Sequence, residues 1–79
     1  MYWTVQVLDS DGDPVKGAEV TTMFTSMWRG KLDEFTDEDG QASFGFDDCS
    51  QGEAKIYVRG QSFGPYYIED GDGLTVNLD

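Results

Sequence analysis

Apolar and polar residues alternate along most of this chain, and glycine and acidic residues interrupt the alternation at short intervals. The clearest stretch is residues 54–58, where Ala54, Ile56 and Val58 alternate with polar neighbours. A period of two residues is typical of a β-strand with one buried face. No segment of helical length shows the 3.6-residue period of an amphipathic helix. The alternation therefore predicts an all-β protein.

About seven short strands are expected, with turn residues every eight to twelve positions or so, as in a sandwich or barrel. The expected strands are residues 3–7, 20–24, 31–36, 42–46, 54–58, 66–68 and 74–78. Arg29-Gly30 is expected at a hairpin tip, and residues 60–65 are expected to form a connection. A chain of 79 residues is one domain in length. We therefore expect residues 1–79 to form a single antiparallel β-sandwich.

Three stretches in the first 46 residues have the spacing of a known family. They are Val5-x-Val7-x-Asp9, Gly12-x-Pro14-Val15-x-Gly17-Ala18-x-Val20 and Thr36-Asp37-x-x-Gly40-x-Ala42-x-Phe44. This pattern resembles the carboxypeptidase regulatory-like domains of the transthyretin-like (prealbumin-like) sandwiches. The resemblance implies a transthyretin-like fold and a non-catalytic accessory role beside enzymes, surface proteins or transporters.

Turn chemistry and close packing account for the residues of this pattern. Gly17 and Ala18 are small, which suits a chain that crosses close to the opposite sheet. Thr36 and Asp37 are expected to hydrogen-bond the turn that follows them, and Gly40 is suited to a positive φ there.

Catalysis is not expected. One enzyme with this fold, a hydroxyisourate hydrolase, depends on histidines and on a C-terminal Tyr-Arg-Gly-Ser sequence. Residues 57–62 echo that ending inside the chain, but the chain contains no histidine. No Ser-His-Asp or Cys-His arrangement can therefore form. Cys49 follows two aspartates that disfavour its thiolate, so we predict neither an enzyme nor a cofactor.

The net charge is −11, from 16 acidic and 5 basic residues. Nucleic acid and anionic membranes are unlikely ligands for such a chain, because they require clustered Lys and Arg. Three interpretations of the acidity stay open: solvated turns, adaptation to high salt, or an acidic inhibitor or nucleic-acid mimic that meets a basic partner. The third would use the acids of residues 33–39 together with Asp47 and Asp48.

The cellular location is not determined by the sequence. A strand pattern begins at Tyr2 without a preceding charged and apolar leader, so no signal peptide is expected. No run of 18 apolar residues predicts a membrane span. The single cysteine excludes an intrachain disulfide. A cytoplasmic protein, if the chain is full length, and a domain cut from a larger exported protein both fit.

Aromatic and basic residues in turns or on outward strand faces are the candidates for partner binding. They are Trp28, Arg29, Tyr57, Arg59, Tyr66 and Tyr67. The expected partner is another protein, including a second copy of the chain, and carbohydrate is the alternative. Charges at Lys31, Asp33 and Glu34 are expected to guard one sheet edge, which leaves the other open to a homodimer.

Two aspartate- and glycine-containing turns are candidates for calcium, because calcium prefers clustered carboxylates. Their residues are Asp9, Asp11, Asp13, Asp70 and Asp72. Neither turn completes a twelve-residue calcium loop, and Asp and Gly are also the ordinary residues of tight turns.

Overall fold

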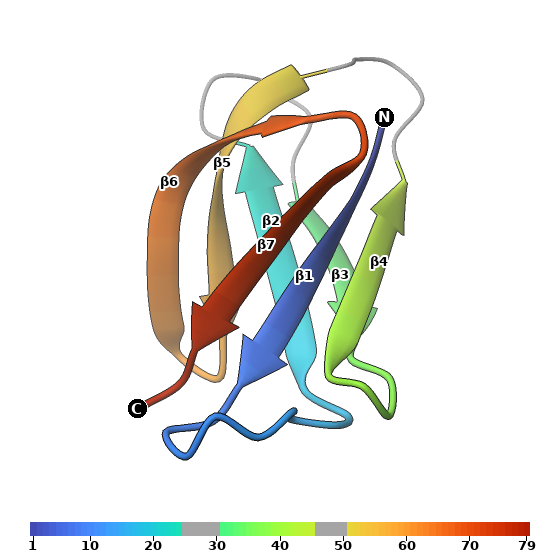
Figure 1. Ribbon diagram of the computed structural model, residues 1–79. Helices are drawn as coiled ribbons and strands as arrows, with labels where there is room; N and C mark the ends of the chain where they lie inside the picture. The colour runs from blue at the N-terminus through green and yellow to red at the C-terminus, as the bar shows by residue number, and fades with distance from the viewer. Residues whose placement is uncertain (25–30, 46–50) are drawn as a thin grey trace.

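Two β-sheets pack face to face in the computed structural model, which describes residues 1–24, 31–45 and 51–79 (Figure 1). The strands are β1 (Tyr2–Leu8), β2 (Glu19–Phe24), β3 (Lys31–Phe35), β4 (Gln41–Gly45), β5 (Gln51–Val58), β6 (Gln61–Glu69) and β7 (Asp72–Asn77). One sheet has the order β4-β1-β7 and the other has the order β3-β2-β5-β6. The predicted all-β sandwich is confirmed. No helix of the described residues is long and apolar enough to cross a membrane.

One strand pair is parallel, which corrects the expectation of a wholly antiparallel sandwich. β1 and β7 run side by side in the same direction, from Trp3 opposite Asp72 to Leu8 opposite Asn77 (Figure 1). Parallel neighbours need a long crossover between them. Here the crossover is everything from β2 to β6, so the first and last strands of the chain lie together.

Residues 61–65 belong to β6 and Gly60 to the short turn before it, so the connection expected over residues 60–65 is wrong. Arg59 and Gly60 have positive φ angles of 50° and 81°, and they alone join Val58 to its partner Gln61. Positive φ at both central residues is the requirement of a two-residue type I′ hairpin turn. Arg59 therefore lies in a turn and not, as expected, on the outward face of a strand. Pro65 is tolerated inside β6 because this is an edge strand.

The core lies between the sheets and is built by inward residues of both. Its buried apolar members are Trp3, Val5, Val7, Ala18, Val20, Phe24, Ala42, Phe44, Ala54, Ile56, Val58, Ile68, Val76 and Leu78. Trp3 is 2% exposed. Its ring stacks on Phe44 with centroids 5.3 Å apart and meets Phe24 edge-on at 5.6 Å. Its Nε1–H donates to the Thr22 hydroxyl at 3.3 Å, so Trp3 of one sheet is hydrogen-bonded to the other.

A buried threonine holds the segment that leads into β2. The Thr36 hydroxyl donates to the Val15 carbonyl at 2.6 Å and accepts the Ala18 N–H at 2.9 Å. Thr36 therefore binds the segment of Val15 to Ala18 and not the turn that follows Thr36. This corrects the expectation that its hydroxyl bonds the following turn. Ala18 is buried, as its small size predicts. Gly17 is exposed, with φ of 72° and open space around it, so it serves the backbone conformation and not close packing.

The Trp3–Thr22 contact gives the first testable prediction. Trp3→Phe leaves the Thr22 hydroxyl without its partner, and Thr22→Val leaves the indole N–H without an acceptor. Each orphaned buried group costs about 1–3 kcal/mol of unfolding free energy. The double variant removes both groups, so urea unfolding should show it to be less destabilised than the sum of the single variants. Strictly additive losses would show that the bond contributes nothing.

Candidate binding surfaces

The four candidate binding residues that the structure describes do not form one patch. Tyr67 points outward from β6 and is 60% exposed, whereas its neighbour Tyr66 packs against the core. Tyr57 is half-buried on the outward side of β5. Of these two adjacent tyrosines, Tyr67 therefore faces away from the core. Tyr66 is removed from the surface candidates.

Arg59 is exposed in the turn between β5 and β6, at the end of the sheet. Trp28 and Arg29, with the expected hairpin tip at Gly30, are outside the described residues. Of the six, only Tyr57 and Tyr67 thus stand on one described sheet face.

The outward side of the four-stranded sheet gathers the exposed apolar and basic side chains. We call it the aromatic–basic face and define it as Met23, Lys31, Phe35, Lys55, Tyr57 and Tyr67. Three large apolar residues of this face are exposed to solvent: Met23 is 40% exposed, Phe35 is 66% exposed and Tyr67 is 60% exposed. Burying apolar side chains of this size is a main source of binding energy at protein interfaces.

Two lysines flank Met23 on this face. The strand register places Met23 opposite Lys31 on one side and opposite Lys55 on the other. Neither lysine forms an ion pair with any described residue. The ion pair found among the described residues joins Lys16 and Glu38 at 3.7 Å, away from this face. Unpaired cations beside an exposed apolar side chain suit a partner that supplies both a carboxylate and an apolar contact.

Acidic residues share this sheet face. Asp33 accepts a hydrogen bond from the Thr21 hydroxyl, and Glu19, Glu53 and Glu69 also stand at outward positions. This side of the sheet therefore carries both signs of charge, with four carboxylates around its two lysines.

Sequence reasoning missed Met23 and Phe35 as members of the candidate site. The available signal was strand parity: Thr22 and Phe24 are inward residues, so Met23 between them points outward. The register opposes Phe35 to Glu19, which also points outward. Because the sequence-based candidates included only tyrosine and tryptophan among apolar residues, they left out two of the three most exposed large apolar side chains of this face.

The outward side of the three-stranded sheet has a different character. Its strand positions carry no charged side chain between Tyr2 and Leu8, Gln41 and Gly45, or Gly73 and Asn77. The Tyr2 ring lies over Gly45, where an added Cβ would come within 2.8 Å of a ring carbon. An aromatic ring thus covers the glycine opposite it, as cross-strand pairs often do in stable sheets.

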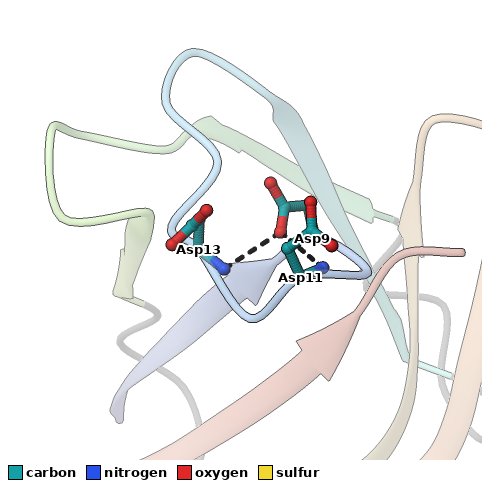
Figure 2. Close-up of side chains that lie close together, drawn as sticks. All are labelled: Asp9, Asp11 and Asp13. Carbon is teal, nitrogen blue, oxygen red and sulfur yellow. Dashed lines mark hydrogen bonds between the residues drawn. The ribbon is translucent and has the colours of Figure 1, made fainter.

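Two acidic turns share one hydrogen-bond pattern. In the first, Asp9 Oδ1 accepts the N–H groups of Asp11 and Asp13, each at 2.9 Å (Figure 2). The Asp9 N–H donates to the Asp13 carbonyl at 2.8 Å, and the Gly12 N–H donates to the Asp9 carbonyl at 3.0 Å. Gly12 has φ of 86°, which completes the turn.

The turn between β3 and β4 repeats these four bonds. Asp37 Oδ1 accepts the N–H groups of Asp39 and Gln41, at 2.9 and 3.0 Å. The Asp37 N–H donates to the Gln41 carbonyl, and the Gly40 N–H donates to the Asp37 carbonyl. Both turns have the sequence Asp-x-Asp-Gly. The first aspartate of each is therefore part of the fold, whatever else the acidic residues do.

The structure brings together only part of the predicted calcium ligands. One carboxylate oxygen from each of Asp9, Asp11 and Asp13 can lie within 4.8 Å of the others. Asp70 lies in the β6–β7 turn and Asp72 begins β7, at the other end of the sandwich (Figure 1). Asp70 there accepts the Tyr2 N–H at 2.7 Å, and Asp72 accepts the Glu69 N–H. Calcium at residues 9–13 stays a prediction, and Asp70 and Asp72 do not join that group.

Comparison with known proteins supports the fold. No family model matches the chain, and no curated protein matches it. Among solved structures, the Bacillus anthracis TIE protein superposes with a TM-score of 0.68 at 15% identity over 98% of this chain. A variant of BcpA, the major pilin subunit of Bacillus cereus, gives 0.63 at 15% identity over 96%. The chain spans 15% and 29% of these two proteins, so each similarity is to one part of a longer chain.

The shared turn geometry predicts a contrast between neighbouring aspartates. Asp9→Ala or Asp37→Ala removes the acceptor of two N–H groups and should cost about 1 kcal/mol of unfolding free energy. Asp11→Ala is the matched control, because its carboxylate accepts no hydrogen bond from the described residues. We expect it to change stability by less than about 0.5 kcal/mol. Equal losses for Asp9→Ala and Asp11→Ala, measured in urea, would contradict this assignment.

Thermal melting with and without calcium tests the predicted ion site. An ion held by Asp9, Asp11 and Asp13 stabilises the folded state by about 2.7 kcal/mol at one hundred times its Kd. The melting temperature should then rise with calcium in the wild type and not in Asp11→Asn. An unchanged melting temperature at millimolar calcium would remove the prediction.

Proposed function

We propose that this domain is a non-catalytic structural or protein-interaction module that binds its partner through the aromatic–basic face. The observation that carries the proposal is the exposure of Met23, Phe35 and Tyr67 on one sheet, with unpaired Lys31 and Lys55 beside them. Large exposed apolar side chains are enriched where proteins meet. The other exposed large apolar residue among those described is Tyr2, which stands on the other sheet, and most remaining exposed side chains are acidic or small and polar.

The partner should present charges of both signs around an apolar centre. Carboxylates would meet the two lysines, and a cation would meet Glu69, which stands beside Tyr67 on the same side of the sheet. Such charge matching contributes mainly to specificity and to association rate, while the buried apolar side chains contribute most of the affinity.

A non-catalytic role is supported by how the buried polar groups are used. The buried polar side chains of the described residues are Thr22 and Thr36, and both are engaged in hydrogen bonds that hold the fold. Among the described residues no ionisable side chain is buried, and the chain has no histidine. A transthyretin-like topology is part of the same proposal, supported by the turn roles of Gly12, Asp37 and Gly40. Likeness to part of a major pilin subunit also favours a structural role.

Two alternatives rest on specific surfaces. The exposed ring of Tyr67 could stack on carbohydrate, with Tyr57 on the same sheet face. An acidic inhibitor or nucleic-acid mimic would use the exposed acids of β3 and of the turn at 37–39. The remaining acids assigned to that role, Asp47 and Asp48, are outside the described residues.

Charge reversal on the face tests the leading proposal. Lys31→Glu and Lys55→Glu should each weaken, by about tenfold or 1.4 kcal/mol, the binding of a partner captured by the wild type and identified by mass spectrometry. Lys16→Glu is the control, because it makes the same charge change away from the face. Equal retention by all three variants would contradict the proposal. Retardation of the wild type but not of Tyr67→Ala in polysaccharide gels would favour carbohydrate instead.

A further inference from the structure

The sandwich has four edge strands, and three of them carry a barrier to further pairing. β3 has charges at Lys31, Asp33 and Glu34, and β6 has Pro65 within it, which lacks an N–H. On β4, the first residue of the strand is occupied, because Asp37 bonds both the N–H and the carbonyl of Gln41. Charge, proline and short pairing length are the usual protections of a sheet edge.

β7 has a charge only at its first residue, Asp72, and lacks these protections from Gly73 to Asn77. It is the outer strand of its sheet, and from Gly73 to Asn77 it contains neither a charged residue nor a proline (Figure 1). Its side chains alternate, with Val76 buried and Thr75 exposed. Leu74 packs against the core but is only partly covered. An uncharged, regularly alternating edge is the kind at which another strand adds.

The net charge restricts which contacts two copies can make. At −11 per copy, most surfaces would bring carboxylates against carboxylates. Antiparallel pairing of two β7 strands about Thr75 brings no carboxylate opposite another from Gly73 to Asn77. Carboxylates come together only at the two ends, where Asp72 lies opposite Leu78 of the second copy and Asp79 lies opposite Gly71, between Asp70 and Asp72.

The same register is complementary in its side chains. Directly opposite residues of an antiparallel pair point to the same side of the sheet. Leu74 would lie opposite Val76 of the second copy on the core side, which covers the open part of Leu74. Thr75 would meet its own copy on the outward side. Because every contact then occurs twice, the arrangement has two-fold symmetry and closes as a dimer.

We propose that a second copy of this chain pairs with the free edge of β7, antiparallel and with the two-fold axis at Thr75. The two three-stranded sheets become one continuous six-stranded sheet. This surface is separate from the aromatic–basic face, so either proposal can fail without the other.

Disulfide trapping tests the register. Opposite residues in an antiparallel pair have Cα atoms about 4.5–5.5 Å apart, within the range of about 4.4–6.8 Å that a disulfide spans. In a Cys49→Ser background, Thr75→Cys should form a covalent dimer under mild oxidation at least about tenfold faster than Ser43→Cys. The control position faces outward on β4, at the opposite edge of the same sheet. Equal rates for the two variants would overturn the proposed register.

Sedimentation equilibrium tests the association itself. The wild type, kept reduced, should approach twice the monomer mass at millimolar concentration, and added salt should strengthen the dimer by screening the net repulsion. Thr75→Lys places like charges at the axis and should return the protein to monomer, whereas Ser43→Lys and Lys55→Glu should not. A monomeric wild type at millimolar concentration and high salt would refute the dimer and leave the proposed function untouched.

Discussion

The contact on which the rest of the structure depends is the burial of Trp3 between the two sheets. Its indole stacks on Phe44, meets Phe24 edge-on and donates a hydrogen bond to Thr22 of the opposite sheet. A domain of this size buries only about 60% of the surface that its unfolded chain exposes. One large aromatic residue that touches both layers therefore contributes a large share of the available core. The outward sides of both sheets are left free for other uses.

The acidity of the chain is partly a requirement of its turns. Asp9 and Asp37 each accept two backbone N–H groups, while Asp70 and Asp72 each accept one. A short carboxylate side chain is suited to this bonding. The remaining exposed acids then keep the surface negative and restrict contacts to places with few carboxylates. The edge of β7 from Gly73 to Asn77 is such a place. The aromatic–basic face instead combines lysines, carboxylates and exposed apolar side chains, and it lies on the other sheet.

Strand parity made most of the core predictable, since alternation assigned Trp3, Val5, Ile56 and Val58 inward without knowledge of the fold. The errors arose where tertiary context decides. Residues 60–65 are predicted to be a connection, yet an edge position and a register shift between Ala54 and Ile56 accommodate Pro65 within β6. That shift also lies beside the pair of tyrosines, whose inward and outward assignment alternation alone left open. The parallel pairing of β1 with β7 joins strands that are far apart in the sequence, so no local sequence pattern predicts it.

The most direct test of the central claim is the urea unfolding of a Trp28→Phe variant, in which Trp3 is the only tryptophan. If Trp3 holds the two sheets together, its emission should be that of a buried indole. Its fluorescence midpoint should then coincide with the loss of β-sheet circular dichroism in a single transition. A solvent-exposed emission spectrum in the folded protein, or a fluorescence change that precedes the loss of sheet, would contradict the claim.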